Sequence, residues 1–208
     1  MVAIGSFNPR LLSPQWFYSQ KLISEKEFDQ SSKNINILAR TVVSFPIGDT
    51  QFEASLDRLQ LSGTLLAESQ IKDLTLSIFS LLEHTPVSGL GVNRAIHFDV
   101  GTEANQAEML NRLYQSTYFN GLMGSSGLAS IAVVDWMPGT DPKAERRMIT
   151  IQPSVRVPFG IYVEVNHHFG TGDEKPLDLA TVVSRLAESW DRILQDTKKL
   201  AEDVVKDS

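Results

Sequence analysis

The sequence predicts an α+β fold, in which core helices pack on one face of a largely antiparallel sheet of six or more strands. Apolar residues alternate with polar ones from Ile161 to Asn166, which is the period of a half-buried strand. Between residues 67 and 83, apolar residues instead recur every three or four positions, which predicts a helix. A longer helical pattern follows over residues 177–205.

Residues 1–34 are expected to form an N-terminal helical arm. Ser13 precedes Pro14 at a predicted helix start, and the Ser24–Glu27 spacing is that of a capping box at a second start. The arm either docks on the core of its own chain or binds a partner. In the second case Trp16 and Phe17 are the expected anchors, because aromatic side chains contribute strongly at interfaces.

Residues 35–176 are expected to form the α+β core. Strands are predicted at 37–45, 52–61 (with a turn or bulge at 57–58), 87–100, 128–137, 147–155 and 161–166, and helices at 67–83 and 103–113. The segment 128–137 is apolar on both faces, as a central strand covered on both sides would be. The residues expected to be buried are Leu74, Ile78, Leu82, Val92, Phe98, Ile161, Val163 and Val165.

A glycine-rich segment at residues 118–127 is expected to be a flexible connection. It lacks the Lys-Ser/Thr ending of a phosphate-binding P-loop, and a strand rather than a helix follows it. Its large side chains leave open a role as a lid over a small ligand.

Residues 177–208 are expected to form a long amphipathic helix that packs on the core. A straight helix of this length reaches about 40 Å, beyond the ~30 Å width of a small domain. The first half of the helix, up to Trp190, should pack on the sheet and form part of the core. The later apolar residues Ile193, Leu200 and Val204 are then expected to be covered by a protein partner, by a second copy or by the N-terminal arm.

The composition of the chain excludes several classes of protein and of catalytic site. The chain has 208 residues, no cysteine and a net charge of -6. Disulfides, thiol catalysis and zinc bound by cysteine are therefore excluded. No apolar run approaches the length of a membrane span, and no signal peptide is recognisable at residues 1–10. The expectation is a cytoplasmic protein with no cofactor. The acidic balance argues against nucleic acid as a partner.

One polar cluster is a candidate site. By strand alternation Asn93, His97 and Asp99 share a face of one strand. A face of another strand is likewise shared by Tyr162, Glu164, Asn166 and His168. If the two strands are neighbours, then His97, Asp99, Glu164 and His168 could bind a metal ion or perform acid–base chemistry. The alternative is a solvated face of an antiparallel sheet.

Three segments carry a resemblance to known sequences: SPQWFYSQKLI at 13–23, DRLQLSG at 57–63 and HTPVSGLGVNRAIHF at 84–98. Together they resemble a group of sporadically distributed bacterial proteins of unknown function. The resemblance implies a bacterial, cytoplasmic α+β protein without an assigned activity. Val-Asn shortly before His-Phe also occurs twice, at 92–98 and at 165–169, which would fit an internal duplication.

These observations favour a non-enzymatic interaction or scaffold subunit of a multi-protein bacterial assembly. The rival functions are a metal-dependent or acid–base enzyme that uses the polar cluster, and a small-ligand module closed by residues 118–127.

Overall fold

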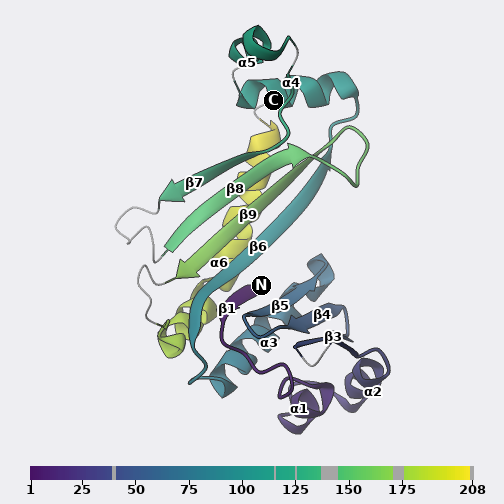
Figure 1. Ribbon diagram of the computed structural model, residues 1–208, viewed down its shortest axis with the longest axis vertical. Coiled ribbons are helices and arrows are strands. Elements are labelled where there is room, and N and C mark those ends of the chain that lie inside the picture. The colour runs from purple at the N-terminus through teal and green to yellow at the C-terminus, as the bar shows by residue number, and fades with distance from the viewer. Residues whose placement is uncertain (39–40, 115, 125, 137–144, 171–175, 207–208) are drawn as a thin grey trace. The chain divides into compact units, whose positions relative to one another are not determined.

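The computed structural model describes the chain apart from residues 39–40, 115, 125, 137–144, 171–175 and 207–208. The α+β class is confirmed: nine strands form an antiparallel open sheet in the order β2-β3-β4-β5-β1-β6-β9-β8-β7 (Figure 1). The strands are β1 Val2–Gly5, β2 Asn36–Leu38, β3 Val42–Ile47, β4 Thr50–Ala54, β5 Arg58–Gly63, β6 Val87–Asp99, β7 Ile131–Trp136, β8 Glu145–Pro153 and β9 Gly160–Gly170.

Apart from α5 (Ser116–Met123), the helices lie close to the expected positions. They are α1 Pro14–Ser19, α2 Glu25–Lys33, α3 Glu68–Leu81, α4 Glu103–Leu113, α5 Ser116–Met123 and α6 Leu179–Lys206, with a 3₁₀ turn at Leu65–Ala67. The predicted caps are present, since the Ser13 side chain accepts a hydrogen bond from the Trp16 amide and Ser24 forms a capping box with Glu27. None of the described helices is long and apolar enough to cross a membrane.

The chain divides into two compact units. The first unit consists of Met1–Val92 and Phe169–Trp190, and the second of Asn93–His168 and Asp191–Ser208. These limits cut across the expected segments 1–34, 35–176 and 177–208. They do so because β6, β9 and α6 each continue from one unit into the other.

Helices α1, α2 and α3 cover one face of the sheet in the first unit. The ring of Phe17 on α1 lies edge-on against Phe45 and Phe52, with centroids 5.4 and 4.8 Å away. The Ser31 hydroxyl on α2 donates to the carbonyl oxygen of Pro46 at 2.5 Å. The predicted arm therefore docks on its own chain, and Phe17 is fully buried there.

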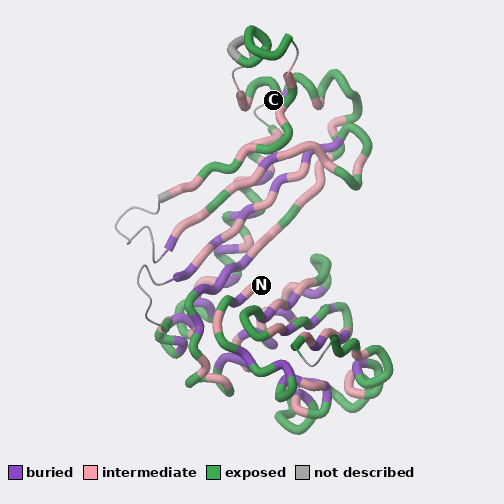
Figure 2. The backbone as a smooth tube through the Cα atoms, viewed as in Figure 1, coloured by how far each residue is buried: buried purple, intermediate pink, exposed green. Residues whose placement is uncertain are grey.

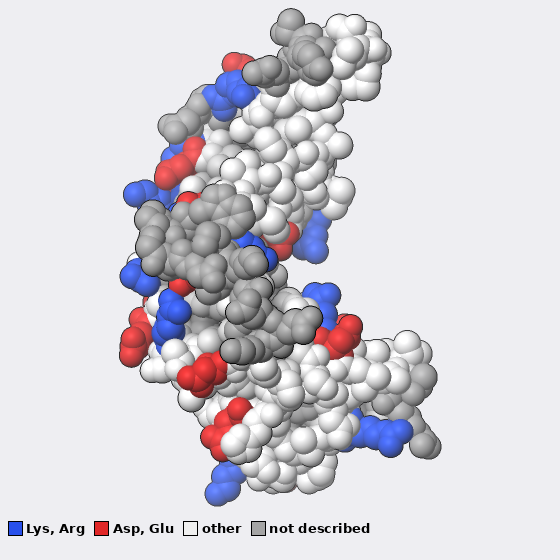
Figure 3. Space-filling view, turned by 60° about the vertical axis from the view of Figure 1, so that its left-hand side comes forward, with Lys and Arg blue, Asp and Glu red and all other residues white. Residues whose placement is uncertain are grey.

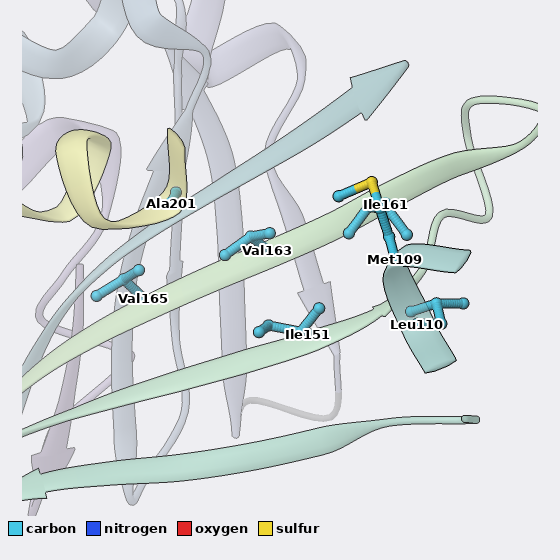
Figure 4. Close-up of a cluster of buried hydrophobic side chains, with 7 residues drawn as sticks. All are labelled: Met109, Leu110, Ile151, Ile161, Val163, Val165 and Ala201. Carbon is cyan, nitrogen blue, oxygen red and sulfur yellow. The ribbon is translucent and has the colours of Figure 1, made fainter. Parts of the chain in front are cut away.

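A hydrophobic cluster forms the core of the second unit (Figure 4). Alternate residues of β9 point into it, and Figure 2 shows the corresponding alternation of burial along this strand. The buried members are Met109, Leu110, Ile151, Ile161, Val163, Val165 and Ala201. On the same face Arg94 of β6 donates to the carbonyl oxygen of Leu194 on α6 at 3.3 Å. The distal part of α6 therefore belongs to this core.

The distal half of α6 corrects one expectation. Ile193 is only 3% exposed, and Leu200 and Val204 pack against the hydrophobic cluster of the second unit. A covering partner was expected because the helix exceeds the width of one small domain. Residues 191–208 instead belong to the second unit, and Leu200 and Val204 are partly buried against its hydrophobic cluster.

Other parts of the chain also differ from expectation. Residues 2–5 form a strand, β1, between β5 and β6, although the sequence pattern predicts only a helical arm there. Part of the expected loop at 118–127 is helical, in α5. Leu82 and Phe98 are half-buried rather than buried. Finally β7, expected as a central strand, is the last strand at one edge of the sheet.

Candidate functional site

The expected polar cluster forms in part on the second unit. Strands β6 and β9 are neighbours, as the prediction requires. The rings of His97 and Tyr162 lie against each other with centroids 4.9 Å apart. This face is opposite to the one that packs on the hydrophobic cluster, because Tyr162 alternates with Ile161 and Val163 along β9.

Ser154, which the sequence did not single out, fixes the orientation of His97. Its oxygen lies 2.8 Å from His97 Nδ1 and accepts the backbone N–H groups of Arg156 and Val157 at 3.1 and 2.9 Å. Two accepted bonds occupy the lone pairs of this hydroxyl, so its proton is left for His97. His97 Nδ1 is therefore an acceptor, and the neutral imidazole carries its proton on Nε2.

Tyr162 connects the His97 ring to Glu164. Its hydroxyl donates to Glu164 Oε2 at 3.0 Å. Burial, together with the hydrogen bond to Glu164 and the charge of that carboxylate, raises the pKa of Tyr162 to about 12. The phenol therefore remains protonated at neutral pH and remains a donor to Glu164.

The other two predicted residues take different roles. Asp99 Oδ1 accepts from the Gly101 amide at 2.8 Å, which fixes the turn after β6. Burial lowers the pKa of His168, and the charges of Arg146 and His167 lower it further. Across the described residues, no three His, Asp or Glu side chains are grouped so that they could hold a metal ion. The cluster is thus a chain of paired contacts from Ser154 to Glu164.

The neighbouring His167 faces the covered side of the sheet, as the alternation along the strand requires. His167 Nε2 lies 2.9 Å from Glu145 Oε1, and both residues are buried. This pair joins the start of β8 to the end of β9. On the same side, Arg147 of β8 donates to Asp135 of β7. Both pairs thus hold adjacent strands of the second unit together.

A cavity of about 440 Å³ lies beside α4 in the second unit. Its described lining comes from the end of β6, from α4 and from Val205 of α6, and includes Asp99, Glu108 and Arg112. No residue of 118–127 is among the described lining residues, and residue 125 of the proposed lid lies outside the described part of the chain. The small-ligand function thus receives no support from the described lid residues.

An apolar groove of about 310 Å³ lies in the first unit, beside the outermost strand β2. Its lining residues come from the segment before α1 and from β2, β3 and the residue that precedes β2. They are Pro9, Arg10, Ser13, Ile35, Ile37, Val42 and Val43. Sequence reasoning missed this groove, although the run Ile35, Ile37 and Leu38 close to a strand end was a visible signal.

Strand β2 itself is exposed at all three positions. Ile37, opposite Val43 in the ladder, is 59% exposed, and Leu38, opposite Val42, is 65% exposed. These side chains point to the two faces of the sheet. Large apolar side chains thus stand on both sides of an edge strand.

Charges are mixed on the face that Figure 3 shows. Lys and Arg side chains alternate there with Asp and Glu, and the described residues make no large patch of one sign on that face. Such a surface lacks the continuous positive potential that attracts phosphate backbones.

The predicted partner-binding residues are now placed. Trp16 is half-buried, and Phe17, Ile193, Leu200 and Val204 are engaged in the core contacts described above. The comparisons with known proteins find no matching family model, no matching curated protein and no matching solved structure.

Proposed function

We propose that this chain is a non-enzymatic interaction subunit of a larger protein assembly, and that the groove beside β2 receives its partner. The exposure of Ile37 and Leu38 on an edge strand, next to an apolar groove, carries this proposal. Contiguous apolar surface of this kind is typical of binding sites rather than of ordinary solvated surface.

The arrangement suits an extended segment of another protein. Strand β2 pairs only with β3 among the described strands, so its other side offers backbone hydrogen-bonding groups to an added strand. A strand added in this way gains affinity from main-chain bonds and specificity from side chains that fill adjacent pockets. The groove would receive an apolar side chain of that segment. Arg10, which lines the groove, would favour a carboxylate nearby.

The geometry of the polar cluster supports a structural role for it. The ring of His97 is held by Ser154, and Tyr162 is held by Glu164. These contacts join side chains of one unit and connect β6, β9 and the loop that follows β8. The proposal therefore assigns binding to the groove and not to this cluster.

The proposal is tested by capture of partners from a lysate of the native host, followed by direct binding of each captured protein in purified form. Ile37→Asp places a charge on the groove lining, whereas Leu66→Asp makes the same change at an exposed apolar residue outside it. We expect the partner to be lost with Ile37→Asp and kept with Leu66→Asp. A partner that binds all three proteins equally, or a wild-type chain that captures none, would contradict the proposal.

A further inference from the structure

Strand β7 has the composition of an interior strand but lies at the edge of the sheet. Five of its six residues, Ile131 to Trp136, are apolar, and they occupy both faces. Strands with this pattern are normally covered on both sides. Here β8 lies on one side, and no described strand pairs with the other. In Figure 1, β7 is the outermost strand of this part of the sheet.

Proteins usually protect such edges against pairing with other chains. The common devices are Lys or Pro in the strand, a bulge, or a very short strand. Strand β7 contains no Lys, Pro or Gly, and its register with β8 is regular from Ile131 to Trp136. Its charged residue, Asp135, is paired with Arg147 of the same chain and so has a partner already. Among the described residues, the edge therefore remains open to a further strand.

The exposed apolar residue at the middle of this edge is Val133. It is 51% exposed and stands opposite Ile149 on the side that carries the helices. Ala132, on the other face, is also exposed. A strand that paired along this edge would cover both residues.

We propose that a second copy of this chain supplies that strand, by antiparallel pairing of β7 with β7 about a two-fold axis through Val133. Because this axis is perpendicular to the sheet, each face of one sheet continues into the same face of the copy. Val133 then lies opposite Val133 of the copy, and Ala132 opposite Val134. Asp135 lies opposite Ile131, so like charges do not meet directly across the strands.

A second copy suits this edge because the strand is complementary to itself. Apolar residues face apolar residues at the three central pairs. A two-fold contact needs one surface patch used twice, and it is the commonest symmetry of soluble oligomers. The proposal is independent of the β2 groove, which belongs to the first unit.

The test compares the full chain with two substitutions to Lys. Val133→Lys introduces an edge-protecting charge at a half-exposed position, and Val155→Lys makes the same change at an exposed apolar residue in the loop between β8 and β9. By light scattering across a concentration series, we expect dimers for wild type and Val155→Lys. For Val133→Lys we expect at least a tenfold higher dissociation constant with an unchanged thermal transition of the monomer.

Cysteine substitution tests the position of the axis, because the chain contains no other cysteine. Directly opposite residues have Cα atoms about 4.5–5.5 Å apart, within the range of ~4.4–6.8 Å that a disulfide accepts. With oxidised glutathione as the oxidant, Val133→Cys should form a covalent dimer, and Val155→Cys should not.

Three results would overturn the proposal. The first is a wild-type chain that stays monomeric throughout the series. The second is a Val133→Lys chain that still dimerises as wild type does. The third is a dimer lost in Val133→Lys for which Val133→Cys does not crosslink, since that would mean a different register or an unlike strand.

Discussion

The hydroxyl of Ser154 donates a hydrogen bond to Nδ1 of His97 across 2.8 Å, and the same oxygen accepts two backbone N–H groups from the following turn. One side chain thus joins the loop between β8 and β9 to strand β6. The imidazole is held in one tautomer by a group that is itself fixed by the backbone.

Removal of this hydroxyl should weaken the second unit. In Ser154→Ala the amides of Arg156 and Val157 and the nitrogen of His97 lose their partner. For a half-exposed site this should cost about 1–2 kcal/mol of the free energy of unfolding. Ser154→Thr keeps the hydroxyl and is the control. Denaturant midpoints measure this loss of stability. Equal midpoints for wild type and Ser154→Ala would refute the role given to Ser154.

The rival enzymatic function predicts a bound metal ion or a reactive cluster. We expect purified protein to carry no stoichiometric transition metal, because among the described residues no three His, Asp or Glu side chains are grouped so that they could hold one. Elemental analysis of wild type, His97→Ala and His168→Ala measures this directly. Stoichiometric metal in the wild type that disappears in both variants would favour the enzyme over the interaction subunit.

Ile78 should be among the most sensitive positions of the first unit. It is fully buried on α3, so Ile78→Ala should cost roughly 2–5 kcal/mol through lost transfer energy and the remaining cavity. Leu66→Ala, at an exposed site, should change the free energy of unfolding by less than about 0.5 kcal/mol. Similar midpoints for the two variants would mean that the face of α3 is wrongly assigned.

The distal half of α6 should behave as core. Replacement of Leu200 and Val204 by Asp puts two charges against the hydrophobic cluster of the second unit, and we expect a loss of roughly 2–4 kcal/mol. Lys199→Asp is the control on the exposed side of the same helix. Thermal unfolding measures both. If the double variant kept the wild-type thermal transition but changed its oligomeric mass, these residues would instead contact a partner, as the sequence suggested.

His168 should make stability depend on pH. Its pKa is lowered in the folded chain, chiefly by burial and then by Arg146 and His167. Near neutral pH it is neutral in both states. As the pH falls below about 6.5, the usual pKa of histidine, the unfolded chain binds a proton that the folded chain resists, so stability decreases.

Substitution of His168 separates its contribution to the pH dependence of stability from the contributions of other titrating groups. Between pH 7.5 and 5 the midpoint of His168→Gln should fall less than that of wild type. His84→Gln, at an exposed histidine, should follow the wild-type curve. Identical pH profiles for all three proteins would rule out the contribution assigned to His168.

Periodicity predicted the elements whose burial is regular. The alternation from Ile161 to Asn166 predicted the position and the facing of β9. That β9 lies beside β6 was only a condition of the predicted polar cluster, and the strand order meets that condition. Periodicity failed where tertiary contacts determine the secondary structure. Strand β1 is only four residues long, too short to show a period, and it is held by ladders to β5 and β6.

Two further failures have physical causes of the same kind. The apolar character of β7 correctly predicted a strand but not its place at an edge. The composition of a strand indicates that its side chains favour burial, but it does not indicate which neighbouring element buries them. The glycines of 118–127 suggested a loop, but Gly121 lies within α5, because glycine lowers helix propensity without excluding a helix. The groove beside β2 was missed because its residues meet from separate segments of the chain.

The division of the chain also sets the order of events during translation. The first unit needs residues 169–190 and the second needs residues 191–208, so neither is a continuous segment. Multidomain proteins commonly complete their N-terminal domain while the rest is still being synthesised. A ribosome must release nearly all of this chain before either unit can be completed. Until then the first unit lacks residues 169–190, which include the first part of α6.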